Sequence, residues 1–342
     1  DQLISPDEFA GRVDRIRELT ARYDGQLGAP TTYELGTLLA FGYFADHALD
    51  LAVVEVGLGG RLDATNVLDT ELAIFTPISY DHTEVLGPTL ASIATEKAGI
   101  IKPGNPVVTS SQAHEAMAVI ERVALEKGAR LILAQPARAA AEPDRITAGQ
   151  AVPAQPAQRL LVPGGTGQLV SLSLLGEHQL TNAGVAIEAA RWLGLDEDAI
   201  ARGLESVRWP GRLEVLRRDP LVVVDGAHNV DSMEKLAAAM RRHFGWQRLR
   251  VIAGFSADKD IPGIARVLNE LADEIVLTRS KHPRSADPSS IARHFPGARI
   301  AGSLQEALAG QRSHELALVT GSLYLDGEAR LALGVTADED PL

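Results

Sequence analysis

Apolar residues in this chain follow two spacings, one typical of buried strands and one typical of helices. In the first third of the chain, apolar runs predict strands in the segments LAVVEV (51–56), LAIFTPIS (72–79), PVVTSS and RLILA. Helical patterns are expected from Ser5, from Thr32 to about His47, and at about 112–127. Because strands alternate with helices, we predict a mostly parallel sheet.

The rest of the chain changes character twice. Residues 135–176 are rich in Ala, Pro and Gln, and LVSLSLLG within them predicts a small antiparallel β subdomain. The segment 209–220 carries turn residues and charges and is interpreted as a connection between domains. A second alternating series follows it. Its strands are expected in LVVVDGA, LRVIAGF, EIVLTR, ARIAG and LALVTGS, with helices at about 231–243, 262–272, 288–294 and 304–309.

One helix carries a charge where a core residue is expected. In the helix predicted from 88 to about 98, Leu90, Ile93 and Ala94 form the apolar stripe, and the next position on it is Lys97. Burial favours the neutral amine, and a neutral amine can take up CO₂ to become a carbamate. That carbamate would supply oxygen ligands to a metal ion.

A simpler interpretation of Lys97 remains open. Its ammonium could reach solvent along the aliphatic stem, or pair with Glu96 or Glu84.

Composition limits the classes of function. The 342 residues suggest two domains, and the net charge of −12 argues against nucleic acid as the main partner. Cysteine is absent, which excludes disulfides and thiolate chemistry. We see no signal peptide and no run long enough to span a membrane, and we expect a cytoplasmic protein.

Two side chains are expected at the carboxyl edge of the first sheet. Glu55 interrupts the strand predicted at 51–56, and His82 follows the next strand. Ligand sites of parallel sheets lie at this edge, and a carboxylate beside a histidine favours a hard cation such as Mg²⁺. The alternatives are that Glu55 pairs with Arg61 and that His82 is a surface residue. The glycines after Glu55 do not complete a dinucleotide-binding fingerprint, because Leu62 stands at its third position.

The second series has its own candidate site. Asp225, His228 and Asn229 follow a strand directly, where a helix N-terminus would favour an anion. Arg212, in the segment WPGRLE, could reach a phosphate across a cleft. The alternatives are a capping or turn role for Asp225 and an interdomain salt bridge for Arg212.

Several segments together carry a family resemblance. EVGLGGRLDATN, DHTEVLGPTLASIATEKAGIIK, GEHQLTNAGVAIEAA, WPGRLE and DGAHN resemble the folylpolyglutamate synthase/dihydrofolate synthase family of the Mur ligase superfamily. The resemblance implies an α/β protein of two domains. They are a Mur-ligase-type central ATP-binding domain (1–212), mostly parallel with a small β subdomain, and a C-terminal Rossmann-like glutamate-ligase domain (213–342).

The resemblance also implies roles for individual residues. It implies one Mg²⁺ ligand at Glu55, a second metal held by His82 and a carbamylated Lys97, and ATP contacts at Asn182, Arg212 and Asp225. His228 matches a histidine near the transferred phosphate. The positions implied on the substrate side are Tyr33, Leu62, Asp63 and Ala64 near the pterin and Ser322 near the incoming glutamate.

The implied reaction is an ATP-dependent amide ligation. ATP phosphorylates a dihydropteroate or folate carboxylate, and the amine of L-glutamate attacks the acyl phosphate. The implied cofactors are two Mg²⁺ ions, with ATP as co-substrate. We expect a monomer that acts on small molecules, without nucleic acid or membrane partners.

One family feature is absent from the sequence. The 342 residues contain no Gly-Lys dipeptide, so they hold no phosphate loop ending in Gly-Lys-Ser/Thr. Either the protein continues upstream or this is a truncated form, and we expect this chain taken alone to show no appreciable glutamate ligation. A non-catalytic nucleotide- or pterin-binding remnant and another Mur-type ligase are the alternatives.

Overall fold

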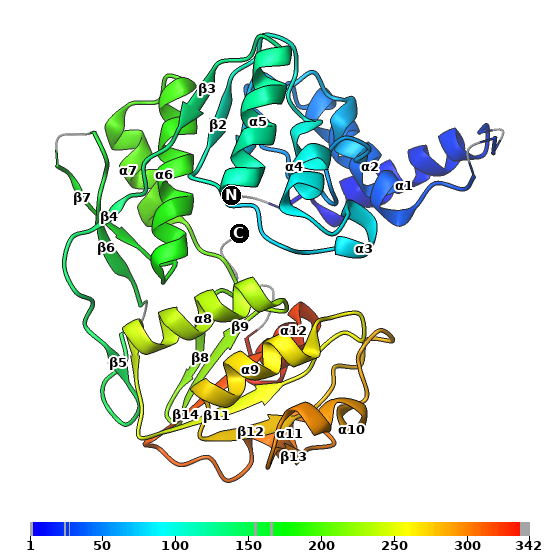
Figure 1. Cartoon of the computed structure of the whole chain (residues 1–342). Coiled ribbons are helices and arrows are strands. Elements are labelled where there is room, and N and C mark those ends of the chain that lie inside the picture. The colour runs from blue at the N-terminus through cyan, green and yellow to red at the C-terminus, as the bar shows by residue number, and fades with distance from the viewer. Residues whose placement is uncertain (1–2, 24, 27, 154–155, 165–166, 336–342) are drawn as a thin grey trace. The chain divides into compact units, whose positions relative to one another are not determined.

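The structure is a computed structural model that describes residues 3–23, 25–26, 28–153, 156–164 and 167–335 (Figure 1). The chain forms two compact units, residues 1–133 and residues 134–341. This division differs from the predicted domains 1–212 and 213–342, which remain a proposal.

The first unit contains a short parallel sheet with helices. Its strands β1 (Ala73–Phe75), β2 (Val107–Thr109) and β3 (Leu131–Leu133) pair in that order. Its helices are α1 (Pro6–Thr20), α2 (Thr32–Asp46), η1 (Ala64–Val67), α3 (Thr83–Leu86), α4 (Leu90–Ala98) and α5 (His114–Glu126). Ser5 caps α1, and Thr31 with Glu34 forms a capping box on α2. The predicted helices and the parallel pairing are confirmed.

The strand predicted at 51–56 is wrong. These residues have no regular secondary structure, and the side chain of Val53 is 85% exposed. A strand needs a hydrogen-bonded neighbour, and none of the residues described in this unit pairs with the segment. The strand predicted at 72–79 is confirmed only at Ala73–Phe75.

The second unit begins with a small β subdomain and two helices. β4 (Arg138–Ala139), β6 (Gln158–Leu161) and β7 (Leu169–Leu172) form an antiparallel sheet, as predicted for this region. Helices α6 (Glu177–Trp192) and α7 (Glu197–Ser206) pack their apolar residues against it. A separate parallel pair joins β5 (Ile146–Thr147) to β10 (Phe244–Gly245).

A six-stranded sheet forms the centre of the second unit. Its order is β13 (Arg299–Ile300), β12 (Glu274–Leu277), β11 (Arg248–Ala253), β14 (Glu315–Thr320), β9 (Leu221–Asp225) and β8 (Glu214–Arg218). All neighbours are parallel except β8, which runs antiparallel to β9 at one edge. The segment 209–220 is therefore not only a connection, because its second half is a strand of this sheet.

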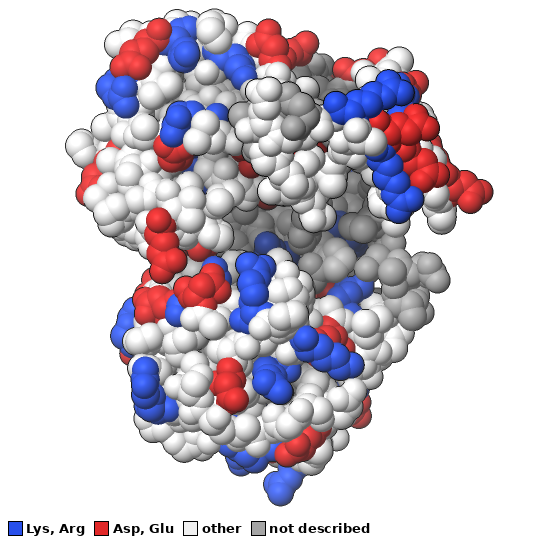
Figure 2. Space-filling view, turned by 90° about the vertical axis from the view of Figure 1, so that its right-hand side faces the viewer, with Lys and Arg blue, Asp and Glu red and all other residues white. Residues whose placement is uncertain are grey.

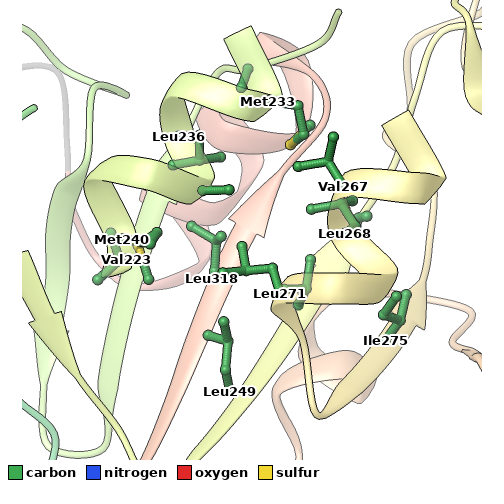
Figure 3. Packing of buried hydrophobic residues seen from close by; sticks show 14 of the residues in the cluster. Val223, Met233, Leu236, Met240, Leu249, Val267, Leu268, Leu271, Ile275 and Leu318 are labelled. Atoms are coloured by element: carbon green, nitrogen blue, oxygen red, sulfur yellow. The ribbon is translucent and has the colours of Figure 1, made fainter. Parts of the chain in front are cut away.

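Helices cover both faces of this sheet. The helices are α8 (Val230–His243), α9 (Ile261–Leu271), α10 (Pro288–Ile291), η2 (Ala292–His294), α11 (Leu304–Leu308) and α12 (Leu323–Ala332). Val223 faces Met240 and the other apolar residues of α8 and α9 (Figure 3). Its neighbours Val222 and Val224 face the apolar residues of α11 and α12. The predicted second α/β series is confirmed.

Charged side chains of both signs are mixed on the surface. Figure 2 shows Lys and Arg beside Asp and Glu on the face in view. Arg266 and Glu234 form one such exposed pair, with Nη2 and Oε1 2.8 Å apart. None of the described helices is long and apolar enough to cross a bilayer.

Candidate active site

Asp63 organises the glycine-rich loop of the first unit. Its Oδ2 accepts hydrogen bonds from the N–H groups of Gly57 (3.1 Å) and Leu58 (2.9 Å). Its Oδ1 accepts from the N–H of Thr65 (3.0 Å) and the hydroxyl of Tyr33 (3.3 Å). Burial alone would raise the pKa of the Asp63 carboxyl, but these donors outweigh burial and lower the pKa. Tyr33 and Asp63, both predicted near the pterin, are therefore in contact through an ionised carboxylate.

The residues on either side of Asp63 differ in exposure. Leu62 is 79% exposed and offers an apolar surface. Ala64 is half-buried and begins η1, which Asp63 caps. Their predicted place near the pterin stays a prediction.

Glu55 lies in an exposed segment and not in a buried strand. Arg61, its suggested alternative partner, pairs instead with Glu96, with 2.9 Å between Nη2 and Oε1. The Arg61 N–H also donates to the Glu96 carbonyl at 2.8 Å, so the loop is fastened to the end of α4. The predicted burial of Glu55 and its alternative pairing with Arg61 are both wrong.

Lys97 is half-buried on α4, one turn beyond the buried residues Ile93 and Ala94. Burial lowers the pKa of the Lys97 amine, and the nearby Asp81 carboxylate opposes that effect. Glu96, which was a suggested partner of Lys97, forms its ion pair with Arg61 instead. Lys97 therefore continues the inward stripe, and burial makes its amine lose a proton more readily than an exposed lysine does.

His82 occupies the N-cap position of α3, without a capping hydrogen bond from its side chain, and has an unusual backbone conformation. Its φ is 50° and its ψ 37°, a left-handed combination that is uncommon outside glycine. Its N–H donates to Asp81 Oδ1 at 2.9 Å, and its Nε2 lies 3.9 Å from the same oxygen. Asp81 is thus close to His82 and acts electrostatically on Lys97. Among the described residues, no three His, Asp or Glu side chains form a group that could hold a metal ion.

In the second unit, Asp225 ends β9 and is buried. Its Oδ1 accepts from the Ala227 N–H (2.9 Å) and its Oδ2 from the Leu213 N–H (3.0 Å). Burial raises the pKa of the carboxyl to about 6, although both donors and the Arg212 charge lower it. The hydrogen bond from the Ala227 N–H is the turn contact that we gave as an alternative role for Asp225. The helix cap is formed by Asn229 and not by Asp225.

His228 is fixed through its backbone and its ring. Its N–H donates to Ser232 Oγ at 3.1 Å, and its Nδ1 lies 2.8 Å from the Gly226 carbonyl oxygen. Because a carbonyl only accepts, Nδ1 carries the proton. This hydrogen bond fixes the orientation of the ring.

Arg212 has an exposed side chain next to this strand end. Its Nη1 lies 3.4 Å from the position that a Cβ on Gly226 would occupy. Its charge acts on Asp225, Asp326 and His178. Among residues 134–335 that are described, Arg212 forms no ion pair, which argues against the salt-bridge alternative within this unit.

Asn182 and Ser322 occupy two further places in the second unit. Asn182 lies on α6 at an apolar cavity of about 330 Å³ between α6, α7 and β7, where its amide donates to Gln179 Oε1 at 3.1 Å. Ser322 is buried and caps α12, accepting from the Tyr324 N–H at 3.2 Å. It follows β14, whose last residue Thr320 is paired with Asp225. Ser322 therefore lies at the same edge of the sheet as Asp225.

Four residues near these candidates were missed from the sequence: Asp81, Glu214, Asp326 and Arg330. The signal for Asp81 was its place directly before His82. Glu214 stood in the segment WPGRLE, which was interpreted only through Arg212. Asp326 and Arg330 could not be selected from the sequence, because polar residues in a helical segment are normally expected on its solvent-exposed face.

Two family models match the chain. The Mur ligase middle domain matches residues 19–190, and the Mur ligase glutamate ligase domain matches residues 211–323. The dihydrofolate synthase/folylpolyglutamate synthase of Bacillus subtilis is 33% identical over 344 residues, covering 96% of this chain and 79% of that protein. The chain belongs to the folylpolyglutamate synthase/dihydrofolate synthase family.

Further members of this family also match the chain in sequence and structure. The corresponding protein of Mycobacterium tuberculosis is 36% identical over 84% of this chain and 62% of its own length. The crystal structure of folylpolyglutamate synthase from that organism, complexed with ADP and AMPPCP, matches with a TM-score of 0.83 at 32% identity, covering 97% of this chain and 80% of that one. FolC of Escherichia coli in complex with DHPP and ADP matches with a TM-score of 0.82 at 30% identity over 97% and 77% of the two chains. The predicted fold class and family are confirmed.

Proposed function

We propose that this protein uses ATP to join L-glutamate to a dihydropteroate or folate carboxylate. The observation that carries the proposal is the match of both Mur ligase domains and of whole family enzymes over nearly the entire chain. In the reaction, the terminal phosphoryl group of ATP passes to the carboxylate and ADP leaves. The glutamate amine then attacks the acyl carbon, an amide bond forms, and phosphate leaves.

The second unit supports an ATP-binding role. Arg212 extends an exposed guanidinium beside the end of β9, where it would pair with phosphate oxygens. Asp225 fixes the backbone on both sides of this point, and the oriented ring of His228 would lie near the transferred phosphate. Asn182 would contact the nucleotide from the cavity beside α6.

A magnesium site is also proposed in the first unit, although its described side chains form no ready-made group of three His, Asp or Glu ligands. Mg²⁺ prefers oxygen ligands, which Glu55 and Asp81 offer, and the neutral amine of Lys97 can add to dissolved CO₂ and release one proton to give a carbamate. That carbamate and His82 would hold one ion and Glu55 another. When bound, Mg²⁺ would offset negative charge on the transferred phosphoryl group.

The remaining proposals concern the substrate contacts, the domain boundary, the oligomeric state and the location in the cell. Tyr33, Leu62, Asp63 and Ala64 would bind the pterin, and Ser322 would lie near the incoming glutamate. The domains would divide near residue 213. We further propose that the protein acts as a monomer in the cytoplasm.

The test is a ligation assay on the product of the complete reading frame, with ATP, Mg²⁺, L-glutamate and either dihydropteroate or tetrahydrofolate. The unchanged protein is expected to form the glutamylated product, detected by mass. Lys97→Ala is expected to lower turnover by on the order of 100-fold or more, because a metal ligand for phosphoryl transfer is lost. Small carboxylic acids added to this variant are expected to restore part of the rate by replacing the carbamate.

The matched control is Lys127→Ala, which removes an exposed lysine from the end of α5. It should leave turnover unchanged. Absence of any glutamylated product from the unchanged protein would overturn the proposed function. Normal turnover of Lys97→Ala without added acid would overturn only the role of Lys97.

A further inference from the structure

The backbone that carries Arg212 is held in a conformation that few residues adopt. Gly211 has φ 71° and Leu213 has φ 47°, so left-handed residues flank Arg212 on both sides. Leucine rarely takes this conformation, and such a residue persists only where its surroundings fix it. Leu213 is buried, so packing around its side chain helps to hold this conformation.

Hydrogen bonds from β9 fix one side of this turn. The Leu213 N–H donates to Asp225 Oδ2 at 3.0 Å, and the Gly226 N–H donates to the Gly211 carbonyl at 2.9 Å. These bonds join the Arg212 turn to the strand end that carries the candidate ATP contacts.

Glu214 fixes the other side. Its Oε2 accepts from the Gly211 N–H at 2.9 Å, and its Oε1 pairs with the guanidinium of Arg330 on α12. The side chain of Arg330 is 11% exposed and that of Glu214 is 24% exposed, so this pair is largely shielded from water. A shielded, hydrogen-bonded ion pair holds its geometry more firmly than a surface pair.

We propose that Glu214, held by Arg330, is a positioning residue that fixes the direction of the Arg212 guanidinium. The inference rests on the proposed function, in which Arg212 pairs with the phosphates of ATP. Glu214 acts on Arg212 through its hydrogen bond to the backbone N–H of Gly211, the residue before Arg212. Its contribution should therefore exist only while Arg212 is present.

The test compares Glu214→Ala, Arg212→Ala and the double variant in the product of the complete reading frame. Glu214→Ala is expected to lower kcat/KM for ATP by about 10- to 100-fold, the effect of a small misplacement of a catalytic contact. KM for glutamate should stay unchanged. In the Arg212→Ala background, Glu214→Ala should change kcat/KM by less than about 2-fold, because the group that it positions is gone.

Two further variants separate positioning from folding. Glu214→Ala removes the carboxylate that pairs with the largely buried guanidinium of Arg330. Glu214→Ala/Arg330→Met removes both charges of this pair and should unfold at nearly the temperature of the unchanged protein. It should show the same loss in kcat/KM as Glu214→Ala. The control Glu234→Ala breaks the exposed pair with Arg266 and should change nothing.

The affinity for the non-hydrolysable analogue AMPPCP, measured by calorimetry in the same variants, does not depend on turnover. It should fall with Glu214→Ala in the unchanged protein, whereas adding Glu214→Ala to Arg212→Ala should lower it no further. Equal losses with and without Arg212, in either measurement, would show a merely structural role and overturn the inference. If the unchanged protein binds AMPPCP but makes no product, the proposed function fails, while the calorimetric comparison still decides this inference.

Discussion

Asp326 places a buried carboxyl group beside the candidate ATP contacts. Its side chain lies between Gly211 and Gly226, with Oδ2 3.4 Å and 3.3 Å from the positions of an added Cβ on each. Both carboxyl oxygens are buried and lack a hydrogen-bond partner among the described residues. Burial raises the pKa of Asp326 well above its ordinary value, and the Asp225 charge raises it further, while Arg212 opposes both. The folded protein therefore favours the protonated form.

This residue should make stability depend on pH. Because the folded-state pKa lies above the unfolded value, the folded protein holds the Asp326 proton more tightly. That contribution is fully present below the unfolded pKa and is lost as pH rises through the folded pKa. Asp326→Asn, which cannot ionise, should therefore gain stability over the unchanged protein as pH rises above the unfolded-state value of about 4. Thermal unfolding of both proteins across this range measures the difference.

The control for that series is Asp198→Asn, in the exposed first turn of α7. Its midpoint should follow that of the unchanged protein at every pH. A constant difference between Asp326→Asn and the unchanged protein across the range would show that Asp326 does not titrate differently on folding.

Helix α6 packs tightly at Gly184 against the segment that precedes β4. A Cβ at Gly184 would lie 2.1 Å from the carbonyl oxygen of Gln135 and 3.0 Å from Cα of Pro136. These are backbone atoms, which cannot turn away as a flexible side chain can. Gly184→Ala should lower the free energy of unfolding by about 1–3 kcal/mol through overpacking.

Gly203 offers a matched comparison on α7. It is exposed in the helix interior, and a Cβ there would meet nothing within 4 Å. Gly203→Ala should raise the free energy of unfolding by about 0.5–1 kcal/mol, since alanine is the better helix former. Denaturant unfolding of both variants gives the comparison. A stabilised Gly184→Ala would contradict the packing described for α6.

Sequence patterns predicted those elements whose signal lies within one segment. The stripe ending in Lys97 and the strand ending in Asp225 are examples, since periodicity and the residues after a strand are local features. The prediction at 51–56 was wrong because a strand also depends on a neighbour, which an apolar run does not report. β8 was missed because Arg217 and Arg218 give this edge strand the composition of a linker.

The candidate site shows the same limit. Arg212, Asp225 and His228 could be selected from motifs, and the structure brings them to one strand end. Glu214 and Asp326 could not be selected in this way. What distinguishes Glu214 is its partner, and what distinguishes Asp326 is its burial, and both depend on the fold. Arg330 stands more than a hundred residues from Glu214 in sequence, so no local pattern could join them.

On the scale of the whole molecule, the proposed site residues divide between the two units. Glu55, His82 and Lys97 belong to residues 1–133, whereas Arg212 and Asp225 belong to residues 134–341. A ligase of this kind must activate the carboxylate by phosphorylation before the glutamate amine attacks.

The most direct measurement follows an oxygen atom through that step. Dihydropteroate with a heavy isotope at both oxygens of its carboxylate is incubated with the complete protein, ATP, Mg²⁺ and L-glutamate, and the released phosphate is analysed by mass. Our account predicts one heavy oxygen in each phosphate, formed together with an equal amount of glutamylated product, because the carboxylate oxygen leaves as part of the acyl phosphate. Unlabelled phosphate, or phosphate released without glutamylated product, would contradict it.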